Sequence, residues 1–162
     1  MKTESKYCLI VTGGSVDQNL LAAVYEGAYG YPVHPYVIGV DKGLEILGQL
    51  DIEPDLIIGD FDSANDGIRA KYVTSPDAVV REKCVVLNPE KDFTDTHVAV
   101  LEAAKRGFTR ALLLGATGTR LDHTLGNLGL LYTCCQEGIH AEILDLHNRI
   151  SLIPVSYTHL RA

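Results

Sequence analysis

The chain has 162 residues, of which 46% are hydrophobic and 22% are charged, and its formal net charge is −7 at pH 7. This composition is typical of a globular domain with a real core and excludes a disordered chain. An acidic chain without a basic tract is a poor candidate for binding nucleic acid, and no apolar stretch is long enough for a signal peptide or a membrane span, so neither nucleic acid nor membrane is expected as a partner. The four cysteines form no C-x-x-C motif and predict free thiols in a reducing cytoplasm.

Predicted strands and helices alternate along the first half of the chain. Apolar, β-prone runs predict strands at residues 7–12, 36–40 and 55–58, and helical patterns are predicted at residues 16–26 and 44–50. Gly13 and Gly14 stand between the first strand and the first helix, which is how a nucleotide-binding α/β unit opens; a plain tight turn explains two glycines equally well. The segment 27–35 predicts a loop.

The alternation continues in the second half. Strands are predicted at residues 85–87, 111–114, 140–144 and 149–153, and helices from Asp92 or Thr94 to residue 106 and at residues 121–136. The polar segment between the third and fourth strands predicts one loose helix at residues 67–72 and a loop that contains Pro76. This order predicts a mainly parallel sheet with helices on both faces, a three-layer α/β/α, Rossmann-like fold. Right-handed crossovers then bring the carboxyl ends of the strands to one edge.

Two carboxylates, Asp60 and Asp62, follow the third predicted strand, with Gly59 before them and Ser63 after them. Carboxylate oxygens suit a hard cation, and Mg²⁺ usually comes with a phosphate. An isolated Asp-x-Asp is as often a solvated acidic turn. The functional argument therefore depends on further polar residues and a glycine that also lie just beyond strands, namely Gly13, Asp41, Asp92, Asp95, Arg120 and Asp122.

A second polar cluster precedes the helix that follows the fourth strand. Lys91, beside Asp92 and Asp95, can neutralise phosphate while the carboxylates hold a metal ion. Taken singly, Asp92 or Thr94 would be an ordinary helix cap.

A third cluster follows the fifth strand. Its glycine-containing turn, which includes Thr117, supplies backbone N–H groups for an anion, and Arg120 offers a fork for phosphate oxygens. Asp122 and His123 can orient that arginine or share a proton. The structural alternative is an Arg120–Asp122 pair that only fixes the start of the helix.

Four blocks of the sequence resemble the thiamine pyrophosphokinase (thiamine diphosphokinase) family, bacterial type. They are residues 40–44 (VDKGL), 54–63 (PDLIIGDFDS), 90–96 (EKDFTDT) and 118–125 (GTRLDHTL), and the resemblance extends from about Cys8 to Ile153. It implies an enzyme that transfers the diphosphate group of ATP to the hydroxyl of thiamine, giving thiamine diphosphate and AMP. It also implies Mg²⁺ as cofactor and a cytoplasmic homodimer.

The same resemblance implies roles for individual residues. Metal ligands would be Asp60, Asp62 and Asp95. Catalytic residues would be Asp41, Asp92, Arg120 and Asp122, with the general base open among Asp41, Asp122 and His123. The nucleotide would bind at Gly13, Gly14, Ser63, Lys91, Thr94, Thr117, Arg120 and His123.

The chain departs from the family pattern in two places. Thr119 stands where a second glycine usually precedes the arginine, and a β-branched residue suits a positive φ poorly, which predicts a different or strained turn. The family also has a C-terminal β-sandwich domain that helps to form the thiamine site, and this domain is expected to be largely absent. We therefore expect residues 1–146 to form the nucleotide-binding catalytic domain, residues 147–154 to begin the truncated second domain, and residues 155–162 to be a poorly packed tail, either foreign or a truncated end.

Two alternatives to the transferase stay open at this point. Without its second domain the chain would bind Mg-ATP but would not turn it over, and thiamine-dependent AMP production separates the two cases. A phosphatase with a nucleophilic aspartate would also use a carboxylate pair such as Asp60 and Asp62. Such enzymes place the pair after their first strand, however, whereas here it follows the third.

Overall fold

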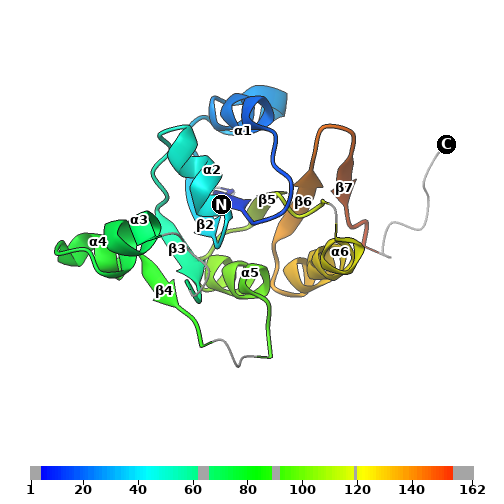
Figure 1. Ribbon diagram of the computed structural model, residues 1–162. Coiled ribbons are helices and arrows are strands. Elements are labelled where there is room, and N and C mark those ends of the chain that lie inside the picture. Colours follow the sequence, from blue (N-terminus) through cyan, green and yellow to red (C-terminus); the bar gives the residue numbers. More distant parts are fainter. Residues whose placement is uncertain (1–4, 62–65, 89–91, 119, 155–162) are drawn as a thin grey trace.

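One seven-stranded sheet organises the computed structural model, which describes residues 5–61, 66–88, 92–118 and 120–154 (Figure 1). The strands lie in the order β4-β3-β2-β1-β5-β6-β7, and every neighbouring pair is parallel except β6 and β7. Their bounds are β1 (Tyr7–Val11), β2 (Tyr36–Val40), β3 (Leu56–Gly59), β4 (Cys84–Val86), β5 (Arg110–Leu114), β6 (His140–Leu144) and β7 (Arg149–Ser151). The mainly parallel sheet predicted from the sequence is confirmed.

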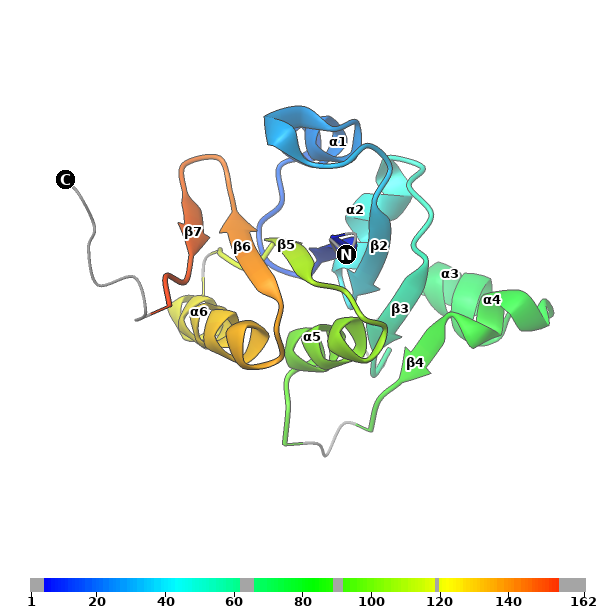
Figure 2. The same cartoon turned by 180° about the vertical axis from the view of Figure 1, so that it is seen from behind.

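Helices cover both faces of this sheet (Figures 1 and 2). The helices α1 (Gln18–Tyr25) and α2 (Gly43–Gln49) pack on one face, and α5 (Asp95–Lys105) and α6 (Leu121–Gln136) pack on the other. Successive side chains of a strand point to opposite faces, so the buried strand β1 contributes Leu9 to the first core and Ile10 to the second. The predicted three-layer α/β/α architecture is therefore confirmed.

The connection from β3 to β4 confirms the predicted helix at residues 67–72, which is formed by α3 (Asp66–Ile68) and a π-helical turn (Arg69–Val73). The predicted loop after it instead contains a further helix, α4 (Ala78–Glu82). The cap explains α4: Asp77 accepts a hydrogen bond from the N–H of Val79 at 2.9 Å, and its own N–H donates to the hydroxyl of Ser75 at 3.2 Å.

Two smaller differences occur near the N-terminus. The first helix begins at Gln18 instead of residue 16 because Asp17 is its N-cap and accepts from the N–H of Leu20 at 2.9 Å. The loop at residues 27–35 contains a short 3₁₀ helix (Ala28–Gly30). All four cysteines are free thiols, as predicted.

The order of the strands creates a switch point between β1 and β5. From β1 the chain adds β2, β3 and β4 on one side of the sheet, then crosses to β5, β6 and β7 on the other. The loops after β1 and β5 consequently lead to helices on opposite faces, α1 and α6. Ligands of open α/β sheets bind in the crevice that this arrangement leaves beyond the carboxyl ends of the strands.

The last strand, β7, is an antiparallel neighbour of β6 in the same sheet. Arg149 of β7 donates two hydrogen bonds of 3.1 Å to the buried carboxylate of Glu142, which also accepts from the hydroxyl of Tyr31 at 2.8 Å.

The predicted division of the chain near residue 146 stays a prediction. Residues 155–162 lie outside the described residues, as does Thr119. Among the described helices, none has the length and apolar character needed to cross a membrane.

Candidate active site

A cleft of about 790 Å³ opens at the switch point, beyond the carboxyl ends of the strands. It is lined by the loops that follow β1, β2, β3 and β5 and by the first turns of α5 and α6. Five of the polar residues predicted to lie just beyond strands therefore do meet at one edge, namely Asp41, Asp60, Asp95, Arg120 and Asp122.

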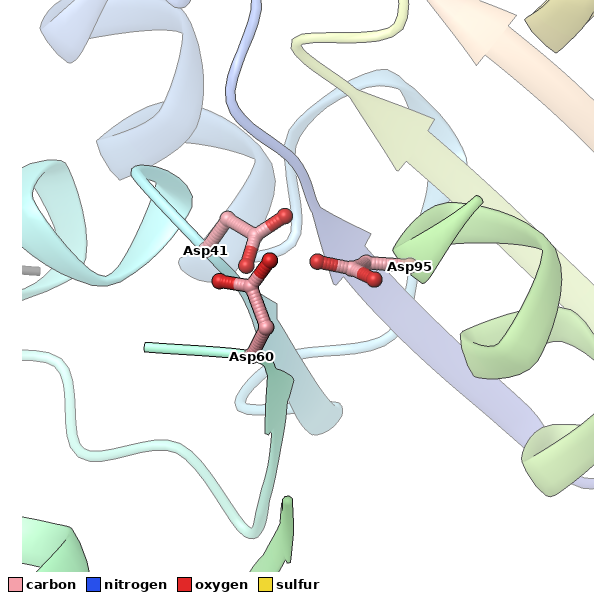
Figure 3. A group of neighbouring side chains, drawn as sticks. All are labelled: Asp41, Asp60 and Asp95. Carbon is pink, nitrogen blue, oxygen red and sulfur yellow. The ribbon is translucent and has the colours of Figure 1, made fainter. Parts of the chain in front are cut away.

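Three carboxylates from three different elements face one another in this cleft (Figure 3). Asp41 follows β2, Asp60 follows β3 and Asp95 opens α5, and one oxygen of each lies within 4.8 Å of the others. All three side chains are half-buried. Like charges at this spacing repel one another unless a cation lies between them, and oxygen ligands suit a hard divalent ion. The residues present therefore fit Mg²⁺.

The backbone around Asp41 and Gly59 aims the first carboxylate. Asp41 has a φ of +47°, which is uncommon for a residue with a side chain, and its N–H donates to the carbonyl of Ile58 at 3.1 Å. Its carboxylate lies directly against Gly59: a Cβ built on that glycine would be 2.5 Å from the Oδ1 atom of Asp41. The absence of a side chain at Gly59 is therefore what lets Asp41 reach the other two carboxylates.

Asp95 is held by its neighbours on both sides. Thr94 is the N-cap of α5 and accepts from the N–H of His97 at 3.2 Å. The hydroxyl of Thr96 lies 2.8 Å from that of Thr12, and both side chains are buried. These contacts attach the start of α5 to the end of β1 and so place Asp95 in the cleft. The hydroxyl of Thr94, predicted to bind nucleotide, serves as the helix cap.

The glycines after β1 allow a close approach, but the group that approaches is another loop of the chain. The N–H of Gly14 donates to the carbonyl of Gly115 at 2.9 Å, and the N–H of Ser15 donates to the carbonyl of Thr117 at 3.0 Å. A Cβ on Gly14 would lie 2.1 Å from the Gly115 oxygen. Gly13 and Gly14 both line the cleft, as predicted, yet the space above Gly14 belongs to the turn after β5.

That turn, residues 115–118, uses its oxygen atoms to hold itself in place. Besides the two carbonyls just described, the carbonyl of Ala116 accepts from the side-chain amide of Asn127 at 2.9 Å. The hydroxyl of Thr117 donates to Asp145 at 2.9 Å, so its proton is not available to a nucleotide. The N–H groups of Ala116, Thr117 and Gly118 donate to no residue in the described part of the chain. They are the donors that the turn has left for an anion.

Cationic groups stand at the mouth of the cleft. Arg120 binds Asp122 through two hydrogen bonds, Nε to Oδ1 at 3.2 Å and Nη2 to Oδ2 at 2.6 Å, and both side chains are exposed. This contact lowers the pKa of Asp122 and raises that of Arg120. His123 lies with its Nε2 atom 3.9 Å from Oδ2 of Asp122. Lys42 also lines the cleft. Sequence reasoning assigned it no role, although its position directly after Asp41 was a usable signal.

Among the predicted residues that the structure describes, one is not part of this group. Asp92 is exposed and is not among the residues that line the cleft. Asp62, Ser63 and Lys91 lie outside the described residues. Residues that the structure adds are Thr12, Thr96 and Asn127 in the cleft wall and Asp145 behind it.

Comparison with known proteins identifies the family. The family described as "Thiamin pyrophosphokinase, catalytic domain" matches residues 32–143. The thiamine pyrophosphokinase of Bacillus subtilis (strain 168) is 35% identical over 121 residues, which cover 75% of this chain and 54% of that protein. Thiamine pyrophosphokinase 1 of Oryza sativa subsp. japonica is 29% identical over 113 residues, which cover 66% of this chain and 40% of that protein.

The fold agrees with a solved structure. The crystal structure of thiamine pyrophosphokinase from Bacillus subtilis matches with a TM-score of 0.70 and 30% identity, over 90% of this chain and 63% of that one. The chain thus spans about half the length of the curated relatives that it matches. On the family match, the sequence identity and the shared fold, the chain belongs to the thiamine pyrophosphokinase family, through its catalytic domain.

Proposed function

We propose that this chain transfers the diphosphate group of ATP to the hydroxyl of thiamine, giving thiamine diphosphate and AMP. The observation that carries the proposal is the cluster of Asp41, Asp60 and Asp95 in the cleft of a chain that belongs to this family. In the reaction the thiamine oxygen forms a bond to the β-phosphorus. The bond from that phosphorus to the oxygen it shares with the α-phosphorus breaks, and the hydroxyl proton passes to a base.

Charge neutralisation is the main requirement of this chemistry, together with alignment of the reacting groups. In the proposal Asp41, Asp60 and Asp95 hold Mg²⁺, which when bound offsets the negative charge of the phosphate oxygens. Lys42 and Arg120 supply fixed positive charge at the cleft, and the N–H groups of residues 116–118 supply hydrogen bonds to an anion.

The proposed metal set narrows the choice of general base. Sequence analysis left it open among Asp41, Asp122 and His123, but a carboxylate that binds a cation is a weak base. Asp122 is weakened too, because its hydrogen bonds from Arg120 lower its pKa. His123, which is exposed and lines the cleft, is therefore the base that the proposal favours.

The relatives are named as enzymes, and the comparisons give no support to a module that binds Mg-ATP without turnover or to a phosphatase. The homodimer and the cytoplasmic location that the resemblance implies stay predictions. Sedimentation velocity with and without Mg-ATP checks the first.

The direct test is phosphorus NMR of ATP, Mg²⁺ and thiamine incubated with the chain. We expect AMP and thiamine diphosphate to form only when thiamine is present, and Asp60→Asn to abolish both products. Asp77→Asn is the matched control, because Asp77 is an exposed helix cap outside the cleft and asparagine also caps helices. Formation of ADP, or ATP left intact by the unaltered chain, would overturn the proposal.

A further inference from the structure

A carboxylate outside the cleft holds the turn that forms part of its wall. Asp145 directly follows β6 and is half-buried. Its Oδ2 atom accepts the hydrogen bond from the hydroxyl of Thr117 at 2.9 Å. Its Oδ1 atom accepts from the main-chain N–H groups of His147 at 2.8 Å and Asn148 at 2.7 Å, and the side-chain amide of Asn148 lies 3.0 Å from both oxygens.

The direction of the Thr117 hydrogen bond follows from the charge on Asp145. Burial raises the pKa of this carboxyl, but hydrogen bonds from Asn148, His147 and Thr117 together lower it by more, so the pKa lies below its usual value. An ionised carboxylate only accepts hydrogen bonds, so the threonine hydroxyl has to donate. Bonds of this kind are shorter and stronger than those between neutral groups.

Thr117 is thereby held from two sides. Its hydroxyl is bound to the turn after β6, and its carbonyl accepts the N–H of Ser15 in the loop after β1. The oxygen atoms of residues 115–117 thus accept hydrogen bonds from the surrounding chain, and the N–H groups of residues 116–118 have no acceptor among the described residues. The orientation of these donors depends on the anchor at Asp145.

We propose that Asp145 is a positioning residue for phosphate binding, which acts through Thr117 on the N–H groups of the turn at residues 115–118. Asp145 does not line the cleft, and it is not one of the three carboxylates, Asp41, Asp60 and Asp95, that are proposed to bind the metal ion. The phosphate ligand rests on the function proposed above. The anchoring itself rests only on the hydrogen bonds.

The test compares Asp145→Ala, Thr117→Val and the double variant, with Mg-ATP as the titrated ligand. We expect each single variant to raise the Kd for Mg-ATP about tenfold, which corresponds to one lost charge-assisted bond. The double variant should be no worse than either single variant, since both changes remove the same bond. Thr117→Ser keeps the hydroxyl and should retain the affinity of the unaltered chain. Binding of Mn²⁺ alone, which reports the three carboxylates, should stay unchanged throughout.

Asp77→Ala is the matched control, since it also removes a carboxylate that accepts a main-chain N–H, but away from the cleft. A second measurement separates failure of this inference from failure of the proposed function. Hydrogen exchange at the N–H groups of Gly14 and Ser15, which bond to the turn, should accelerate in Asp145→Ala and Thr117→Val and not in the control. If the unaltered chain binds no Mg-ATP, the proposed function falls and hydrogen exchange still decides the anchor. Unchanged exchange and unchanged affinity in both variants would overturn the role of Asp145.

Discussion

Gly59→Ala should weaken metal binding while leaving the fold intact. A Cβ at this position would lie 2.5 Å from Oδ1 of Asp41, whereas ordinary contact begins near 3.4 Å. The carboxylate must therefore move by roughly 1 Å, which it can do cheaply because it is the end of a flexible side chain. Displacing one ligand of three by this much should reduce Mn²⁺ affinity about ten- to hundredfold, the size of effect seen when the groups that orient a metal ligand are altered. Electron paramagnetic resonance of added Mn²⁺ measures the affinity, and urea unfolding measures stability.

Gly48→Ala is the matched control because a Cβ on Gly48 in α2 meets nothing within 4 Å. It should leave Mn²⁺ binding unchanged and stabilise the helix by up to about 1 kcal/mol. The double variant Asp41→Ala, Gly59→Ala shows whether the effect passes through Asp41, because it should then bind Mn²⁺ no more weakly than Asp41→Ala alone. Unaltered Mn²⁺ affinity in Gly59→Ala would refute the placement of Asp41 in the metal set.

Two further predictions concern packing. Gly115 and Gly107 have φ values of +76° and +77°, but a Cβ at Gly115 would lie 2.3 Å from the Thr12 carbonyl oxygen while one at Gly107 meets nothing within 4 Å. Urea unfolding should therefore show a loss of about 3 kcal/mol or more for Gly115→Ala and about 1 kcal/mol for Gly107→Ala, and equal losses would count against the close approach of the two loops. Burial raises the pKa of the Cys134 thiol to about 12, so at pH 8 only on the order of one thiol in ten thousand is ionised. A thiol reagent should label the exposed Cys135 in the native protein and Cys134 only after unfolding, as mass spectrometry of the peptides would show; rapid labelling of Cys134 would contradict its burial.

The positions of Asp41, Asp60 and Asp95 follow from a rule that needs only the sequence. Residues directly after buried strands, or at the start of the next helix, collect at one edge of a parallel sheet. The strand that ends at Val40 and the buried run before Asp60 are both visible as apolar segments. The shared location of the three aspartates at one edge of the sheet can therefore be predicted from the sequence alone.

Their division into roles did not follow from the rule. Sequence analysis assigned Asp41 to catalysis and Asp60, Asp62 and Asp95 to the metal, whereas the structure brings Asp41 within reach of Asp60 and Asp95. That reach depends on a φ of +47° at Asp41 and on the bare surface of Gly59, neither of which periodicity reveals. Asp62 lies outside the described residues, and its role stays a prediction.

Contacts between loops that are distant in the sequence could not be predicted from the sequence either. Gly14 and Gly115 are 101 positions apart in the printed sequence, and a glycine that approaches a phosphate looks the same in sequence as one that approaches another loop. The helix α4 was missed for a local reason. Pro76 suggested a loop, but a proline just before a good N-cap such as Asp77 is compatible with a helix that begins after both.

The rule that finds the three carboxylates also selects Asp145, which follows β6 at the same edge. Position alone therefore does not distinguish a metal-binding carboxylate from one that holds a turn in place. The groups around the carboxylate oxygens of Asp145 identify its role. Asp145 accepts hydrogen bonds from Thr117, His147 and Asn148, which stabilise its charge without any ion. In the proposed metal set, oxygens of three carboxylates lie within 4.8 Å of one another, and a divalent cation would offset their mutual repulsion. Replacing Asp145 should therefore disturb the turn and leave Mn²⁺ binding intact, while replacing Asp60 should remove Mn²⁺ binding and leave the turn in place. A loss of both properties in either variant would show that ligand and anchor are not separate at this edge.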